Sequence, residues 1–270
     1  MQNIINNIDD TNKSIIINKC RGNNFGDVLN DYIPLKCGYN IEIDSKKKHL
    51  LFIGSTIEYC NSDSIICGAG IINSKSVFPK PHLVLLVRGP LTRKRFIDLG
   101  YDCPENYGDP GLLLSHIYRP LSLNKKYKMG IIPHIIDYHQ MIAYMHTTNN
   151  NFNYKVIKFA TGVDSVESTI NEINECEYII SSSLHGLITS HSYGIKAIWV
   201  SSFNKLHGDN VKFLDYYASI DIIKISPMIF NENFLSISDK IINAYPNPTY
   251  LKISQVINNI KRIIPFNIAL

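Results

Sequence analysis

Short apolar runs that each end in a turn containing glycine or serine are the feature that most constrains this fold. Such runs cover residues 49–53, 83–87 and 178–181, and patterns typical of helices follow at 91–99 and 186–193. Strands that are apolar on both faces and alternate with helices are typical of parallel sheets buried between helical layers. The sequence therefore predicts an α/β protein.

The alternation of strands and helices restarts after a polar segment at 124–128. We therefore predict two Rossmann-like domains with parallel sheets facing a cleft, at 1–124 and 125–245, and a helical tail at 246–270 that could pack back on the first. Strands are expected at 14–18, 49–53, 64–67, 83–87, 129–133, 155–158, 178–181 and 197–200. Helices are expected to start near Asp27 and to cover 91–99, 137–146, 166–176, 186–193 and the region from 239 onward.

Composition excludes several classes of protein. The net charge of +4 comes without a dense Lys/Arg stripe, so nucleic acid is not an expected partner. The six cysteines show no CxxC spacing, which argues against a disulfide framework and a zinc site. The start of the sequence lacks the pattern of a signal peptide, and no apolar stretch approaches the roughly 20 residues that span a bilayer. We therefore expect a soluble, cytoplasmic protein.

The segment at 177–199 carries the strongest candidate site. Ligands of parallel α/β sheets bind beyond the carboxyl ends of the strands, where loops lead into helix N-termini. Here an apolar strand leads into Ser181, Ser182 and Ser183, which could cap a helix whose free N–H groups favour an anion. His185 falls in the first turn of that helix and is a candidate acid or base, although a capped helix with an incidental histidine is the structural alternative. His191 is expected to be structural.

A second candidate segment follows the strand at 83–87. Arg88 comes directly after that strand, and Arg93 lies in the next helix. A guanidinium at such a position can bind a carboxylate or phosphate through two hydrogen bonds. The alternative for Arg88 is a surface position or a salt bridge that closes two domains. Asp109, in the sequence YGDP, is expected to order a turn through an Asx-type bond.

The remaining candidates are weaker when each is taken alone. Lys205 and Lys212 follow the last strand and could neutralise a phosphate, or could belong to a solvated loop. Further substrate-binding candidates lie after other predicted strands: Gly54, Ser55, His134 and Asp27.

Taken in order, these segments resemble the polysaccharide pyruvyl transferase family. The resemblance spans residues 25 to 220 and rests on the motifs FGDVLNDYI, IGSTIEY, ICGAG, LVRGPLTRKRFIDLG, YGDPGLLL, GIIPH, IISSSLHGLITSHSYGI and KFLDYYASI. It implies a fold like the GT-B glycosyltransferases. It also implies transfer of a pyruvyl group from phosphoenolpyruvate to a sugar as a ketal, with release of phosphate. Phosphoenolpyruvate and a carbohydrate acceptor are then the expected partners.

This activity gives the candidate residues expected roles. His185 would be the main general acid/base, because histidine cycles readily near neutral pH. Arg88 would hold the donor, with help from Lys212. No cofactor is expected, and no metal, because the sequence has no convincing cluster of metal ligands. Members of the family often carry an arginine directly before the Leu-His pair, where this chain has Ser183. The donor's cation must then come from Arg88, Arg93 or Lys212.

Two other functions fit the same pattern. A glycosyltransferase of the GT-B type that uses a nucleotide sugar would have the same architecture, because fold does not fix function. A non-catalytic glycan-binding relative is the third possibility, and Ser183 is the one feature that hints at it.

Overall fold

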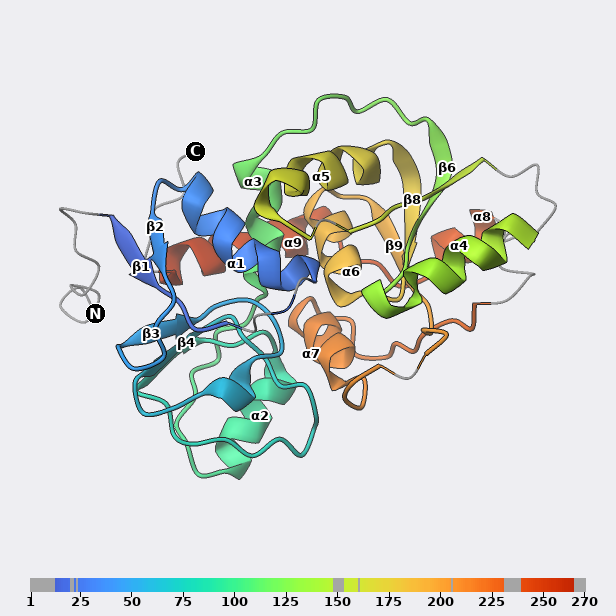
Figure 1. Ribbon diagram of the computed structural model, residues 1–270. Coiled ribbons are helices and arrows are strands. Elements are labelled where there is room, and N and C mark those ends of the chain that lie inside the picture. The colour runs from blue at the N-terminus through green and yellow to red at the C-terminus, as the bar shows by residue number, and fades with distance from the viewer. Residues whose placement is uncertain are drawn as a thin grey trace.

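The computed structural model describes residues 13–19, 22, 24–147, 153–159, 161–204, 206–230 and 239–264. Its strand pairs are all parallel within these ranges. In the N-terminal half, β1 pairs with β2, and β3, β4 and β5 form a second sheet in that order; a bridge between Ile17 and Leu50 links the two. The C-terminal sheet has the order β7-β6-β8-β9. The prediction of an α/β protein with parallel sheets is confirmed (Figure 1).

Each strand predicted from an apolar run is present. The strands are β1 (Ser14–Ile16), β2 (Asn40–Glu42), β3 (His49–Leu51), β4 (Ser64–Cys67), β5 (Leu83–Leu86), β6 (Tyr127–Ile132), β7 (Tyr154–Val156), β8 (Cys176–Ser181) and β9 (Lys196–Trp199). The helices are α1 (Phe25–Lys36), α2 (Pro90–Asp98), α3 (Leu114–Ile117), α4 (Tyr138–Thr147), α5 (Val166–Asn174), α6 (Leu184–Ser192), α7 (Val211–Ser219), α8 (Asp239–Ala244) and α9 (Tyr250–Ile263). Short 3₁₀ turns include η2 (Pro110–Leu113) and η3 (Ile135–Asp137).

Both faces of each main sheet are buried, which explains why the strands are apolar throughout. Along β8, Ile179 belongs to the largest hydrophobic cluster and its neighbour Ile180 to a second one beneath α4. Along β3, Leu50 and Leu51 divide in the same way between the largest cluster and a third beneath α2. The largest cluster runs without interruption from β1 and β3 through α1 to β8, α6 and α9. One core therefore joins the two halves of the chain.

One predicted boundary differs from the structure, one strand was not predicted, and one open alternative is decided. The helix predicted near Asp27 begins two residues earlier, because the Asn24 side chain caps it by accepting from the N–H of Gly26. The short strand β2 was not predicted, because it is polar and half exposed and so does not form an apolar run in the sequence. The possible solvated loop after β9 contains α7, which buries Phe213, Asp215 and Tyr216.

The C-terminal helix α9 lies against the N-terminal sheet. Its Val256 and Ile260 approach Gly108 so closely that a Cβ on that glycine would lie 2.8–2.9 Å from their side chains. The division into domains at residue 124 stays a prediction. Among the described residues, no helix combines the length and the apolar character that a membrane span requires.

Candidate active site

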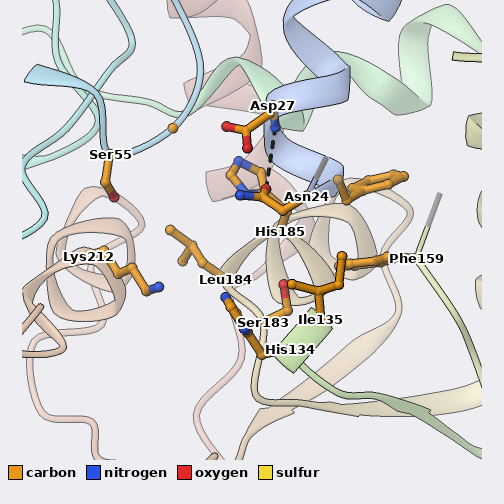
Figure 2. A pocket seen from close by; sticks show the side chains of 12 residues that line it. Asn24, Asp27, Ser55, His134, Ile135, Phe159, Ser183, Leu184, His185 and Lys212 are labelled. Carbon is orange, nitrogen blue, oxygen red and sulfur yellow. Dashed lines mark hydrogen bonds between the residues drawn. The ribbon is translucent and has the colours of Figure 1, made fainter. Parts of the chain in front are cut away.

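One pocket collects most of the predicted site residues. It lies beyond the carboxyl ends of β3, β6 and β8 and is bordered by the N-terminal turns of α1, α6 and α7 (Figure 2). The free space between its walls is about 570 Å³, a volume that includes open solvent. The lining residues are Asn24, Phe25, Asp27, Gly54, Ser55, His134, Ile135, Phe159, Ser183, Leu184, His185 and Lys212. Seven of the predicted residues thus meet in one place: Asp27, Gly54, Ser55, His134, Ser183, His185 and Lys212.

The N-terminus of α6 opens into this pocket. Ser183 is the N-cap residue, but its hydroxyl makes no capping hydrogen bond, in contrast to the prediction that the serines cap the helix. Ser181 instead accepts from the N–H of Ser183 and donates to backbone carbonyls. The N–H groups of Leu184 and His185 have no hydrogen-bond partner among the described residues. Free N–H groups at a helix N-terminus form a binding site for an anion.

Lys212 supplies a positive charge from the opposite wall of the pocket. It lies in the first turn of α7, and no described acidic side chain pairs with it (Figure 2). Burial, and secondarily the charge of Arg88, lowers the pKa of Lys212 to about 8. Burial and the charge of Lys212 also lower the pKa of His134 to about 4. At neutral pH the lysine is therefore still charged, while the histidine is neutral.

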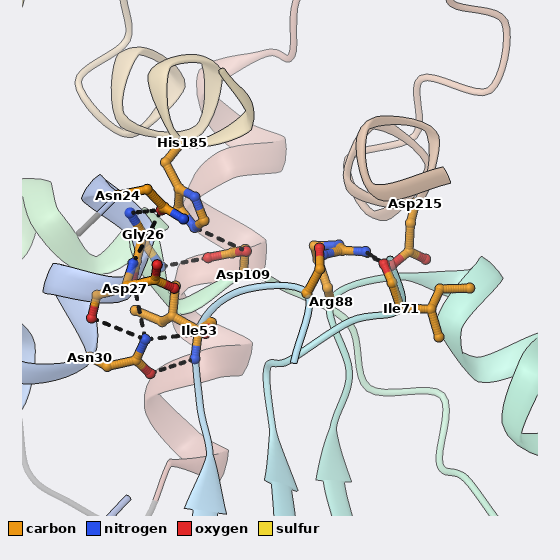
Figure 3. Close-up of polar contacts among 12 residues, drawn as sticks. Asn24, Gly26, Asp27, Asn30, Ile53, Ile71, Arg88, Asp109, His185 and Asp215 are labelled. Atoms are coloured by element: carbon orange, nitrogen blue, oxygen red, sulfur yellow. Dashed lines mark hydrogen bonds and ion pairs between the residues drawn. The ribbon is translucent and has the colours of Figure 1, made fainter. Parts of the chain in front are cut away.

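His185 faces a buried carboxyl group. Its Nε2 lies 3.8 Å from Oδ2 of Asp109, and neither atom has a hydrogen-bond partner (Figure 3). Burial, followed by the charges of Arg88 and Lys212, lowers the pKa of His185 to about 3. Burial raises the pKa of Asp109 to about 6. The imidazole is therefore neutral at pH 7, with one ring nitrogen unprotonated, and it does not titrate near neutral pH as an exposed histidine would.

Asp27 contributes a second carboxyl to the pocket. Its Oδ2 is buried without a partner, and burial raises its pKa to about 6. Because Asn24 performs the capping of α1, the Asp27 side chain is not needed for the helix start and remains available to a ligand.

Arg88 lies behind the pocket wall and does not line the pocket. Its guanidinium is fully buried and donates to Asp215, Ser55 and the Ile71 carbonyl, at 3.1, 2.9 and 2.7 Å (Figure 3). Asp215 also accepts from the N–H groups of Leu91 and Thr92, so it caps α2 from α7. Arg88 thus forms a salt bridge between distant segments, which is the structural alternative to a role in anion binding given in the sequence analysis. Through Ser55 it still touches the pocket wall, and its predicted contact with a donor stays a prediction.

Other predicted site residues lie elsewhere. Arg93 is on α2, where it pairs with Glu105 and the Cys103 carbonyl. The Ser182 hydroxyl accepts from the N–H of His134 and so holds the loop after β6 next to α6. Lys205 lies outside the described residues. His191 is structural, because its ring nitrogens are 2.8 Å from the Tyr216 hydroxyl and 3.2 Å from Asn247.

Glycines in the motifs allow close approaches around the site. A Cβ on Gly26 would lie 2.2 Å from Cε1 of His185, and one on Gly70 would lie 2.3 Å from Cζ of Arg88. A Cβ on Gly89 would lie 2.0 Å from the Asp215 carbonyl oxygen. No real Cβ fits at these distances, so the motifs FGD, GAG and RGP each mark a place where another segment touches the backbone.

We expect Gly26→Ala to lower turnover by roughly 10²-fold, because displacing a reacting group by about 1 Å can have an effect of that size. The new methyl group would push the His185 ring aside. Alanine is otherwise the better helix former, so a loss of activity would come from the clash. Steady-state kinetics on the purified variant measure it. Gly162→Ala is the matched control, because a Cβ there meets no atom within 4 Å; equal activity in both variants would contradict the prediction.

Sequence reasoning missed several residues of this site. Asn24, Phe25, Ile135, Phe159 and Leu184 line the pocket without having been selected. Asp109 was assigned only to its turn, which it does order through the N–H of Gly111. Nothing in the sequence indicated a role for Asp215 except that it lies in the motif KFLDYYASI. In the described part of the chain, no three His, Cys, Asp or Glu side chains gather as a metal site would require.

Comparison with known proteins agrees with the motifs. The family described as polysaccharide pyruvyl transferase matches residues 3–202. An uncharacterized protein of Acanthamoeba polyphaga mimivirus is 30% identical over 177 residues, which are 64% of this chain and 61% of that protein. The chain thus spans less than two thirds of this relative's length. No solved structure matches the chain.

Proposed function

The chain belongs to the polysaccharide pyruvyl transferase family, and we propose that it transfers a pyruvyl group from phosphoenolpyruvate to a sugar as a ketal. The observation that carries this proposal is the pocket in which the uncapped α6 N-terminus, Lys212 and neutral His185 converge. It combines an anion-binding wall with a proton acceptor, and the reaction requires both.

The donor carries a phosphate and a carboxylate. Its anionic groups would bind between Lys212 and the free N–H groups of Leu184 and His185. Many family members carry an arginine directly before the Leu-His pair, where this chain has Ser183. We propose that Lys212 supplies the missing positive charge from the facing wall of the pocket. Asp27 and the Ser183 hydroxyl would bind acceptor hydroxyls, since neither has a structural partner to give up.

The reaction needs one proton at carbon and loses two from the sugar. In our scheme, His185 takes the proton of the first sugar hydroxyl and delivers it to the donor's methylene carbon, which becomes the methyl group. The hydroxyl oxygen bonds to the adjacent carbon. The bond from that carbon to the phosphate oxygen then breaks, and the second hydroxyl adds there. Its proton leaves with the phosphate as hydrogen phosphate. Atoms and charges balance without a further cofactor.

A GT-B-like arrangement is part of this proposal. The N-terminal sheets β1-β2 and β3-β4-β5, which a bridge links, would form one Rossmann-like domain, and the C-terminal sheet β6–β9 would form the other. Helices cover both faces of the two larger sheets (Figure 1). The pocket lies where loops from both sheets meet, which is where such an enzyme brings donor and acceptor together.

We expect Lys212→Met to weaken phosphoenolpyruvate binding by roughly 10- to 150-fold, because a charge-assisted hydrogen bond contributes about 1.5–3 kcal/mol. Binding to the wild type should also weaken as pH rises through about 8, where Lys212 loses its proton. Lys212→Arg should bind without that alkaline loss, because a guanidinium stays charged. Calorimetric titration from pH 7 to 9 measures all three. Lys224→Met, at an exposed lysine, is the control; a Lys212→Met protein that binds like the control would contradict the assignment.

Calorimetry also tests the function itself and requires no knowledge of the acceptor. The protein is titrated with phosphoenolpyruvate and, separately, with common nucleotide sugars. Saturable binding of phosphoenolpyruvate alone is the expected result. Binding of a nucleotide sugar without phosphoenolpyruvate would replace the proposal by a glycosyltransferase. A sugar-binding protein that takes neither donor would be a non-catalytic relative.

A further inference from the structure

The two carboxyl oxygens of Asp109 have different surroundings. Oδ1 accepts from the N–H of Gly111 at 2.9 Å and so starts η2. Oδ2 is buried, takes no part in the turn and has no hydrogen-bond partner. A turn needs only the first oxygen, so the second is a buried acceptor that the fold leaves unused.

The unused oxygen faces a second unused polar atom. Nε2 of His185 is also buried without a partner, and the two atoms are 3.8 Å apart (Figure 3). Buried polar atoms are almost always hydrogen-bonded. A hydrogen bond would require them to approach by about 1 Å. The whole ring packs against Gly26, where an added Cβ would lie 2.4 Å from Nδ1 and 2.9 Å from Nε2. His185 lines the pocket, and of its two ring nitrogens only Nε2 is a buried atom without a partner.

We propose that Asp109 is the positioning residue of His185: its Oδ2 receives the Nε2 proton, so that Nδ1 keeps a free lone pair for the substrate. This inference rests on the proposed function for its consequence in catalysis, but not for its geometry. The imidazolium that forms when Nδ1 takes the hydroxyl proton would be stabilised by the same carboxylate. The pair would then close to hydrogen-bond distance during the reaction.

Protonation of Asp109 should reverse this arrangement. Burial raises the pKa of Asp109 to about 6, and Arg88 and Asp215 act on it in opposite directions. Below that pH the protonated carboxyl would donate to Nε2, and the ring proton would move to Nδ1. Burial, together with the charges of Arg88 and Lys212, keeps the resting ring neutral at this pH. The wild-type kcat/KM should therefore fall as pH decreases through about 6.

Asp109→Asn separates the two roles of this residue. The amide oxygen can still accept from Gly111, so the turn is retained. The amide N–H₂ would then face Nε2, which favours the tautomer with its proton on Nδ1 and removes the base. We expect kcat to fall by roughly 10²–10⁴-fold. The fall of kcat/KM below about pH 6 should become shallower but not disappear, because Asp27 in the same pocket also has a pKa raised to about 6. A purely structural Asp109 would leave both kcat and the pH profile unchanged.

Nitrogen NMR of the histidine rings tests the tautomer without any substrate. The His185 signal is identified by its absence from His185→Gln. At pH 7.5 the wild type should carry its proton on Nε2, and Asp109→Asn should carry it on Nδ1. An identical tautomer in both proteins would overturn the inference. A tautomer switch in a protein that does not bind phosphoenolpyruvate in the calorimetric titration would support the positioning role and refute the proposed reaction.

Discussion

Turnover of phosphoenolpyruvate should fall by roughly 10²–10⁴-fold in His185→Ala, while the affinity for phosphoenolpyruvate changes only a few-fold. The fall has the size expected when a positioned acid or base is lost. Affinity is retained because the N–H groups at the start of α6 belong to the backbone, and Lys212 is unchanged. Phosphate release under single-turnover conditions and calorimetric titration measure the two quantities separately.

His191→Gln is the matched control for this variant. His191 lies on the same helix and is also buried, but its ring bonds to Tyr216 and Asn247. We expect this change to lower the free energy of unfolding and to leave turnover per folded molecule unaltered. His185→Ala with turnover within threefold of the wild type would remove the imidazole from the reaction scheme.

The second large effect concerns stability. Removing one partner of the Arg88–Asp215 pair should lower the free energy of unfolding by about 3–5 kcal/mol, because the other charge is left buried and unpaired. Both side chains are 0% exposed. In Asp215→Asn the α2 N–H groups keep an acceptor, but Arg88 loses its counter-charge. Urea unfolding of each variant measures the change.

A double variant separates the charge from the packing. Arg88→Met combined with Asp215→Asn leaves no unpaired charge, so its loss of stability should be smaller than the sum of the two single losses. Lys94→Met tests an exposed pair, Lys94–Asp98 on α2, and should change stability by about 0.3–0.5 kcal/mol. Additive losses at Arg88 and Asp215 would mean that the ion pair contributes nothing.

The strands and the pocket were predictable because both follow from local sequence. A buried strand must be apolar on both faces, and the loop after it must carry the polar side chains that meet at the sheet edge. His185, Ser55 and Lys212 were found on this basis, since each follows a strand. The start of α1 was placed two residues late because Asp27 and Asn24 are both good N-caps, and only the backbone geometry decides between them.

Partnerships between distant segments could not be read from the sequence. Arg88 was expected in the open pocket because a strand-end arginine suits an anion. Its partner Asp215 lies 127 residues further along the chain. Nothing local to Asp109 revealed that one of its oxygens faces His185, because the turn alone accounts for an aspartate at that position.

The continuity of the hydrophobic core limits how substrates can enter the pocket and how products can leave it. If the two halves swung apart to admit a donor, they would expose apolar side chains on α1, α6 and α9 and would separate Arg88 from Asp215. Entry and exit should therefore use small movements of the pocket-lining side chains that are at least partly exposed, which include Phe159, Ile135 and His134. If the proposed reaction holds, changes to these pocket residues should alter which acceptor is used, and changes to the buried interior should alter stability.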